Sequence, residues 1–209
     1  VEKKTSTGGY ISKAVVGASR EAYAGAADNL IKWKVTVNAN RVSLTNPSIR
    51  DDIQAGHALF VDSDHPLTVK KNGQAAASFP SEDELQTDGG MSLAIDTDKE
   101  GFALTFPEGA STASYTVEFY TQLTDDGIDS LYAGANSDDE QATAAFINDV
   151  YLYLGAATEP AGSASATKTY TLEMLHKSGG AYSVADHAVK WTLVVNRNQL
   201  PMTDAVVTD

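Results

Sequence analysis

Two stretches of sequence, each built around one of the two tryptophans, decide the fold of this chain. Residues 22–38 read AYAGAADNLIKWKVTVN, and residues 181–196 read AYSVADHAVKWTLVVN. In each stretch an aspartate lies five residues before the tryptophan and an asparagine lies five residues after it. Apolar and polar side chains alternate around both tryptophans, which is the pattern of a β-strand with one buried face. The chain therefore contains an internal repeat, and the repeated unit includes β-strands.

The repeat extends beyond the tryptophans in both directions. Lys13 and Lys177 precede them, and Asp51 and Asp209 each follow their tryptophan by 18 residues. The first copy continues through further strand-like segments, whereas the second copy stops at Asp209. We therefore expect the second copy to be incomplete. Half a sandwich cannot close a hydrophobic core of its own.

The composition of residues 157–168 marks a boundary between the two copies. This segment reads ATEPAGSASATK, a small and polar stretch that is typical of a linker. We therefore expect a sandwich at residues 1–156, a linker at residues 157–168 and an incomplete second domain of the same kind at residues 169–209.

Strand signals dominate the first copy. Period-two alternation is clear in residues 31–37, 114–123 and 144–154, which are bounded by Gly, Asn, Asp and Pro. This pattern predicts an all-β protein. One short helix is expected at residues 81–86, where Ser81 and Glu84 have the spacing of a capping box.

The composition excludes several classes of function. The formal net charge is -13 and the pI is about 4.6, so we expect no nucleic-acid partner, because phosphates repel an acidic surface. No run approaches the roughly 18 apolar residues of a membrane helix, and no membrane insertion is expected. Cysteine is absent. The histidines lack metal-ligand spacing, so we expect no metal and no cofactor, and we interpret all four as exposed loop residues: His57, His65, His176 and His187.

Strand alternation places three polar side chains, Lys13, Asp51 and Asn148, on the core face, because residues two apart share a face. Each has apolar neighbours two positions before and after it: Ile11 and Val15, Ile49 and Ile53, and Phe146 and Val150. Burying any one of these polar groups alone costs several kcal/mol. We therefore expect the three to meet in the core.

This trio has the chemistry needed for a covalent cross-link. Burial lowers the pKa of a lysine towards the neutral, nucleophilic amine and raises the pKa of an aspartate towards its protonated form. A protonated Asp51 polarises the Asn148 carboxamide, the Lys13 amine attacks it, and ammonia leaves. The alternative is a hydrogen-bonded cluster that never reacts, or a bulge that turns one residue to solvent.

Five segments carry a resemblance to a known family. They read GYISK, DNLIKWKVTVN, SIRDDIQAGHAL, ALTFPEGASTASYTVEFYTQLTD and AAFIN, and together they span nearly all of residues 10–153. They resemble the isopeptide-forming, collagen-binding domains of staphylococcal and related Gram-positive wall-anchored adhesins and pilins. The resemblance implies an immunoglobulin-like β-sandwich with extra strands, a reactive lysine at Lys13, a catalytic aspartate at Asp51 and a reactive asparagine at Asn148.

The same resemblance extends to the second copy. Lys177 then corresponds to the lysine and Asp209 to the aspartate, and the asparagine lies beyond the sequence. Asp28 competes with Asp51 for the role of the acid because it is repeated as Asp186. Its turn-rich surroundings favour a turn or strand cap instead.

Two acidic segments are candidate calcium sites. Residues 125–140 carry six acids and no base, and a solvated acidic loop is favoured over a calcium ion. Residues 96–101 imitate the start of an EF-hand loop, but the twelfth position is Pro107, so a hairpin turn is favoured.

The favoured function is a structural or adhesive module on the bacterial cell surface, with an extracellular, wall-anchored parent protein and neighbouring domains as partners. A module that binds a host matrix protein such as collagen, another protein or a glycan is the second hypothesis. A carbohydrate-binding accessory domain is third, because both tryptophans share a face with aliphatic residues and read as core. No serine has the surroundings of a catalytic nucleophile, and a turnover enzyme is not expected.

Overall fold

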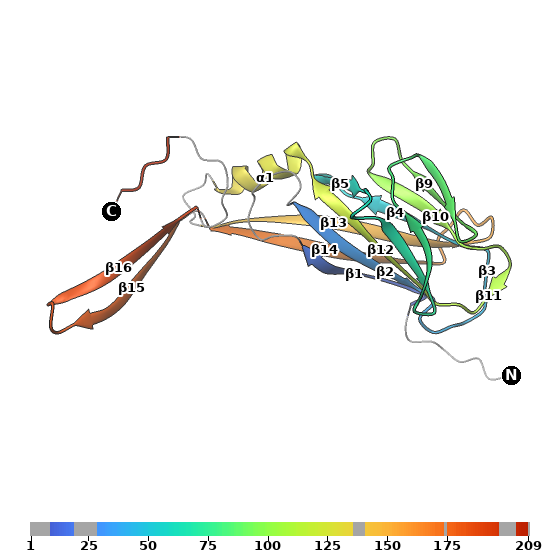
Figure 1. Ribbon diagram of the computed structural model, residues 1–209, viewed down its shortest axis with the longest axis horizontal. Helices are drawn as coiled ribbons and strands as arrows, with labels where there is room; N and C mark the ends of the chain where they lie inside the picture. The colour runs from blue at the N-terminus through green and yellow to red at the C-terminus, as the bar shows by residue number, and fades with distance from the viewer. Residues whose placement is uncertain (1–8, 19–28, 136–140, 174, 197–203, 209) are drawn as a thin grey trace.

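The structure is a computed structural model of the whole chain, and it describes residues 9–18, 29–135, 141–173, 175–196 and 204–208. Two six-stranded sheets pack face to face (Figure 1). The first sheet has the order β1 (Ile11–Ala18), β2 (Leu30–Val37), β12 (Tyr115–Leu123), β6 (Leu67–Lys71) and β7 (Gln74–Phe79), and β5 (His57–Phe60) also pairs with β12. The second sheet has the order β14 (Gly162–Glu173), β13 (Gln141–Leu154), β4 (Pro47–Ile53), β10 (Gly101–Thr105), β9 (Met91–Ile95) and β8 (Leu85–Asp88).

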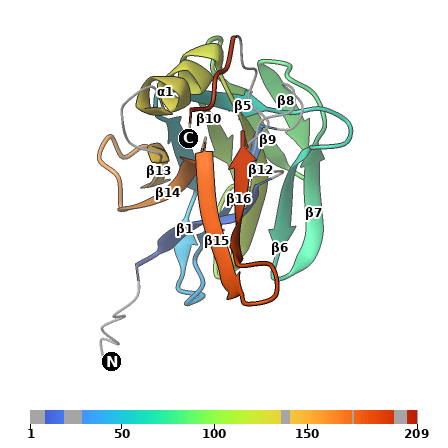
Figure 2. The ribbon, with the colours of Figure 1, turned by 90° about the vertical axis from the view of Figure 1, so that its left-hand side faces the viewer.

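The remaining elements lie around or beyond this sandwich. They are the paired short strands β3 (Leu44–Thr45) and β11 (Ala110–Ser111), the helix α1 (Asp125–Ala135), and the strands β15 (Leu175–Ser183) and β16 (Ala188–Val195). β15 and β16 form a two-stranded sheet, and Figure 1 shows this hairpin projecting from one end of the sandwich. In Figure 2 the hairpin stands in front of the sandwich, which is seen end-on.

The core lies between the two sheets because their strands alternate buried and half-exposed residues. β4 and β12 show this alternation along their whole length. Trp33 and Phe119 from the first sheet are fully buried, and Phe102 from the second sheet packs edge-on against Phe119 with ring centroids 5.0 Å apart. The fold is an all-β, immunoglobulin-like sandwich with extra strands, as the sequence indicates.

The helix was predicted at the wrong place. Residues 81–86 contain no helix, and the Ser81 hydroxyl donates to Asp83 instead of capping one. The helix α1 begins directly after Thr124, whose hydroxyl accepts a hydrogen bond from the backbone N–H of Gly127. Much of the segment that was predicted to be an acidic loop is therefore helical.

The prediction of a linker at residues 157–168 is wrong for its second half. Residues 162–168 lie in β14, which pairs with β13 along its length and continues to Glu173. The inward positions Ala164 and Ala166 are small because β14 lies beside β1, so the strand has no large apolar residues to reveal it. Tyr170, which was assigned to the second domain, is buried against Phe146 in this sandwich.

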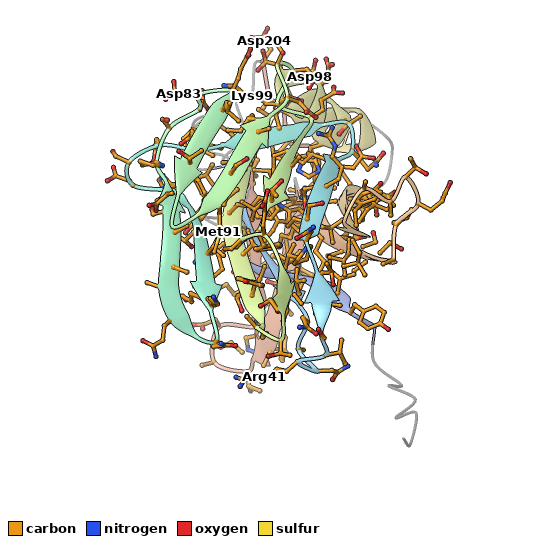
Figure 3. All side chains as sticks on the ribbon, turned by 90° about the vertical axis from the view of Figure 1, so that its right-hand side faces the viewer. Arg41, Asp83, Met91, Asp98, Lys99 and Asp204 are labelled. Atoms are coloured by element: carbon orange, nitrogen blue, oxygen red, sulfur yellow. The ribbon has the colours of Figure 1, made fainter. Side chains whose placement is uncertain are left out.

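The segment that imitates an EF-hand forms the expected turn between β9 and β10. The backbone N–H of Lys99 donates to the Asp96 carbonyl, and Lys99 has a positive φ of 61°. Figure 3 shows Asp98 and Lys99 at one end of the sandwich, with Arg41 at the other end. No helix in the described part of the chain is long and apolar enough to cross a membrane.

Candidate cross-linking site

The three polar residues predicted to meet in the core come from three strands and both sheets. Lys13 lies on β1 in the first sheet, whereas Asp51 and Asn148 lie on the neighbouring strands β4 and β13 of the second sheet. In the β13–β4 register Asn148 is opposite Ile53, and Val150 is opposite Asp51. The two polar side chains are therefore diagonal neighbours on the inner face of their sheet.

The amine of Lys13 contacts both partners. Its Nζ atom lies 2.5 Å from Asp51 Oδ2 and 2.5 Å from Asn148 Oδ1. A third hydrogen bond of 3.1 Å goes to the backbone carbonyl of Asp149. The side chains of Lys13 and Asp51 have zero solvent exposure, and Asn148 is fully buried as well. The expected meeting in the core is therefore present, while the chemical roles of the three residues remain a prediction.

Burial controls the protonation of the site. Desolvation lowers the pKa of Lys13, although the neighbouring Asp51 carboxylate opposes that shift. Desolvation also raises the pKa of Asp51 to about 6, against the lowering effect of the Lys13 charge. The rings of Trp33 and Phe119 lie 5.8 Å and 5.4 Å from the Lys13 nitrogen and keep water from it. Burial thus shifts the pKa of each group in the direction of its neutral form.

Two buried polar atoms of the site have no hydrogen-bond partner among the described residues. They are Asp51 Oδ1 and Asn148 Nδ2. An unpaired buried N–H group costs about 1–3 kcal/mol, so the carboxamide NH₂ group is held at a free-energy cost. A reaction that expels this nitrogen removes that cost.

His57 was wrongly interpreted as an exposed loop residue. It is 2% exposed and lies within the core beside the rings of Trp33 and Phe146. The Thr121 hydroxyl accepts a hydrogen bond from Trp33 Nε1 and lies 2.9 Å from His57 Nδ1. His57 Nε2 lies 3.0 Å from the backbone carbonyl of Ile147, the residue before Asn148.

This chain of hydrogen bonds fixes the histidine tautomer. Because the Ile147 carbonyl can only accept, the neutral ring carries its proton on Nε2 and donates it to that carbonyl. Nδ1 is then an acceptor, so the Thr121 hydroxyl donates to it while accepting from Trp33 Nε1. Burial lowers the pKa of His57 to about 4, so the ring is neutral. The relay joins the sheet that carries Lys13 to the backbone next to Asn148. The signal for it was present in the sequence, because His57, Leu59 and Val61 alternate on one buried face.

The described lysine of the second copy has different surroundings from Lys13. Lys177 is exposed on β15, with its Nζ atom 5.0 Å from the Trp191 ring centroid. Trp191 is 58% exposed, so its interpretation as a core residue is wrong for the described chain. No described strand covers that face of the hairpin, and all residues of β16 are exposed. Asp209 and the competing acid Asp28 lie outside the described residues.

The described residues contain no group of three or more His, Asp or Glu side chains placed to hold a metal ion. The Asp62 carboxylate accepts hydrogen bonds from the backbone N–H groups of Asp64 and His65, so it stabilises a turn.

Comparison with solved structures gives remote matches to surface proteins of Gram-positive bacteria. The collagen-binding domain from a Staphylococcus aureus adhesin is 16% identical with a TM-score of 0.43, covering 77% of this chain and 95% of that one. The collagen binding subdomain of the Enterococcus faecalis surface protein ACE is 16% identical with a TM-score of 0.40, covering 78% of this chain and 94% of that one. The major pilin subunit BcpA of Bacillus cereus is 8% identical with a TM-score of 0.40, covering 80% of this chain and 41% of that one.

The family comparison is the decisive one. No curated protein sequence matches the chain. The family model described as the collagen binding domain matches residues 22–148, a span that includes two of the three clustered residues, Asp51 and Asn148, and more than half of the chain. The resemblance noted in the sequence is thereby confirmed: this chain belongs to the collagen binding domain family, a family of adhesin domains rather than of enzymes.

Proposed function

We propose that this chain is a structural and adhesive module of a Gram-positive surface protein, stabilised by an isopeptide bond that forms between Lys13 and Asn148 without a cofactor. The observation that carries the proposal is the position of the Lys13 amine, 2.5 Å from both Asp51 Oδ2 and Asn148 Oδ1 in a site closed to solvent. Extracellular location and wall anchoring of the parent protein belong to the same proposal.

The first step is a proton transfer inside the buried pair. The Lys13 ammonium passes a proton to Asp51 Oδ2, and both groups become neutral. Desolvation favours this state because it removes two charges from an apolar core, in agreement with the lowered pKa of Lys13 and the raised pKa of Asp51.

The second step forms the new bond. The lone pair of the neutral Lys13 nitrogen attacks the carboxamide carbon of Asn148, and the carbonyl oxygen takes up the electron pair. The protonated Asp51 donates a hydrogen bond to that oxygen and stabilises its developing charge. Both reacting groups are held in place by the sandwich, so the reaction has the advantage of an intramolecular process.

The third step expels ammonia. The carbonyl re-forms as the bond from carbon to Nδ2 breaks, and a proton from the former Lys13 amine, relayed by Asp51, converts the leaving group to NH₃. The balance is one amine and one carboxamide giving one secondary amide and one ammonia. Nδ2 has no hydrogen bond among the described residues to hold it back.

Intact-mass measurement tests the proposal. The purified protein should be lighter than its sequence mass by one ammonia, and a proteolytic digest should contain a peptide joining Lys13 to Asn148. Removing either reacting group, in Lys13→Ala or Asn148→Ala, should restore the full mass.

The role of Asp51 is tested separately with Asp51→Asn. This variant should fold and cross-link about 10²–10⁴-fold more slowly, the usual contribution of a general acid–base group. Asp52→Asn is the matched control, because Asp52 is the next residue on β4 and is not fully buried. A wild-type protein of full mass contradicts the bond, and an Asp51→Asn variant that reacts at the normal rate contradicts the role of the acid.

A groove on the outer face of the first sheet supports ligand binding as a second candidate function. It has a volume of about 360 Å³ and is lined by residues of β2, β12, β6 and β7. Lys32 and Lys70 flank Glu118, at 3.2 Å and 3.7 Å, and the Lys32 ammonium lies 5.5 Å from the Tyr120 ring centroid. A mixture of paired charges and an aromatic ring suits an extended, polar host ligand such as a collagen helix.

Binding to immobilised collagen, with and without Tyr120→Ala, tests the second candidate. Substitution of this ring should weaken binding at least several-fold, whereas Tyr153→Ala, on a strand of the other sheet, should not. Equal binding by the wild type and Tyr120→Ala would show that the groove is not the binding surface.

A further inference from the structure

Asn148 lies at the point where β13 stops pairing with β4. The ladder between these strands ends with Asn148 opposite Ile53. From there back to Gln141, β13 pairs only with β14 among the described strands. The ends of a paired segment open more readily than its middle. The carboxamide of the proposed cross-link therefore projects from backbone that needs a further restraint.

That restraint acts on the residues directly before Asn148. The Ile147 carbonyl accepts a hydrogen bond of 3.1 Å from the backbone N–H of Gln54, and it lies 3.0 Å from Nε2 of His57. The ring of Phe146 packs edge-on against the imidazole, with ring centroids 5.7 Å apart. His57 therefore holds two consecutive residues of β13 at the place where β4 no longer does.

The other end of the relay lies beside the amine. The Thr121 hydroxyl, which is paired to His57 Nδ1, accepts a hydrogen bond of 2.8 Å from Trp33 Nε1. The Trp33 ring lies 5.8 Å from the Lys13 nitrogen and 5.7 Å from the His57 ring. One buried hydroxyl thus connects the ring that borders the amine with the backbone that carries the carboxamide.

Packing of the core alone does not call for polar groups at these two positions. The other inward residues of β12 are aromatic or aliphatic: Tyr115, Val117, Phe119 and Leu123. Replacing both members of a buried hydrogen-bonded pair with apolar groups of the same shape is close to neutral for stability. The polar pair of Thr121 and His57 therefore indicates a role beyond filling space.

We infer that Thr121 and His57 are positioning residues for the cross-link, which hold the Asn148 backbone and the Trp33 ring so that the carboxamide carbon stays within reach of the Lys13 amine. Neither residue gives or takes a proton in the reaction. A misplacement of about 1 Å can slow a reaction about 100-fold, so the relay can set the rate in a chain that is correctly folded. This inference rests on the proposed function, because it concerns the rate of that reaction.

The rate of ammonia loss in newly made chains tests the inference. The full chain is synthesised by cell-free translation, synthesis is stopped, and samples are quenched with acid over time, at a temperature low enough that the parent reacts over minutes. Intact mass gives the cross-linked fraction of each sample. Resistance to a protease gives the folded fraction, so that the rate is counted for folded chains alone.

Two substitutions at Thr121 separate its hydroxyl from its shape. Thr121→Val keeps the shape and removes the hydroxyl, and its folded chains should cross-link about 10-fold to 100-fold more slowly. Thr121→Ser keeps the hydroxyl and should react within a few-fold of the parent rate. Equal rates for the parent and Thr121→Val, or equal slowing by both substitutions, would overturn the role of the hydroxyl.

Two substitutions at His57 test the bond to the Ile147 carbonyl in the same way. Gln and Leu are similar in size, but only the Gln carboxamide can place an N–H group near the position of Nε2. His57→Leu should slow the reaction about 10-fold to 100-fold, and His57→Gln should recover most of that loss. If His57→Gln reacts no faster than His57→Leu, the N–H group does not position Asn148.

Leu93→Ala shows whether loss of stability alone slows the reaction. Leu93 is fully buried on β9, two strands away from β4 in the second sheet. Its folded chains should react at the parent rate, and slowing equal to that of Thr121→Val would overturn the inference. A parent chain that never loses ammonia contradicts the proposed function itself. A parent that reacts beside a Thr121→Val variant of equal rate contradicts only the role of the relay.

Discussion

At the scale of single residues, the Thr121 hydroxyl joins two buried rings, those of Trp33 and His57. It accepts from Trp33 Nε1 at 2.8 Å and donates to His57 Nδ1 at 2.9 Å. Thr121→Val keeps the shape of the side chain and removes both hydrogen bonds, so we expect a loss of about 1–3 kcal/mol in the free energy of unfolding.

Urea denaturation measures this loss, with Thr116→Val as the control. Thr116 lies on the same strand but faces outward and is half-buried. An equal effect of the two substitutions would show that the relay contributes nothing beyond strand packing.

His57 should make stability depend on pH. Its pKa is about 4 in the folded chain, lowered by burial from an ordinary value of 6.5. Between these values the unfolded chain binds more protons, so stability falls as the pH falls from 6.5 towards 4. From the shift, the loss at pH 5 is on the order of 2 kcal/mol.

The comparison between the wild type and His57→Gln isolates this effect. Asp51 titrates in an overlapping range with the opposite sign, since its raised pKa favours the folded state as the pH falls, but it is common to both proteins. His57→Gln should be less stable than the wild type at pH 7, and the difference should shrink at pH 5. A difference that is constant with pH would mean that the ring is not buried as a neutral base.

The cluster of Lys13, Asp51 and Asn148 could be predicted from the sequence because each lies in a strand with clear apolar neighbours. His57 could not be placed with the same ease, since its strand, β5, is only four residues long. The histidines were examined for the spacing of metal ligands. That test does not detect a histidine that is buried in the core, with its ring nitrogens paired to a threonine hydroxyl and a backbone carbonyl.

At the scale of elements, the helix α1 approaches the β4–β5 turn through two glycines. A Cβ atom on Gly127 would lie 1.8 Å from the carbonyl oxygen of Gly56. Only glycine, which has no Cβ atom, can therefore make this close approach. Gly127→Ala should therefore displace the helix and lower the free energy of unfolding by at least about 1–3 kcal/mol.

Thermal denaturation checks this, with Gly17→Ala as the control. A Cβ on Gly17 makes only an ordinary contact of 3.7 Å with Lys32. If Gly127→Ala has the higher melting temperature of the two, the helix does not dock through this contact.

Strands and helices were hardest to predict where small or acidic residues obscure the pattern of apolar side chains. β14 alternates Ala164 and Ala166 with outward serines, and without large apolar residues it resembles a linker. α1 was hidden by its acids, although Thr124 as a cap and the inward pair of Ile128 and Leu131 mark an amphipathic helix. Trp191 is exposed because no described strand covers its face of β16, and local alternation cannot reveal whether a face is covered.

At the scale of the whole molecule, the proposed bond closes a long loop between the two sheets. Lys13 and Asn148 are 135 residues apart in sequence. By the chain-entropy argument used for disulfides, closing a loop of this length stabilises the folded state by about 5 kcal/mol. The double variant Lys13→Met and Asp51→Asn, which removes the amine and the carboxyl group, should unfold at a correspondingly lower denaturant concentration.

Guanidinium denaturation of the wild type and the double variant measures this difference. The matched comparison is Lys177→Met and Asp52→Asn, which makes the same chemical changes away from the core. Equal midpoints for the wild type and the core double variant would show that no covalent bond closes the loop.

The same separation in sequence sets how much chain the domain can release when a surface protein is stretched between its ends. With the proposed bond between Lys13 and Asn148 in place, tension would pass directly from β1 to β13, and the residues between them would carry none. At full extension those 135 residues would otherwise add roughly 480 Å to the length of the protein. A cell tethered through such a module would stay at a nearly fixed distance from its anchor, whatever the shear.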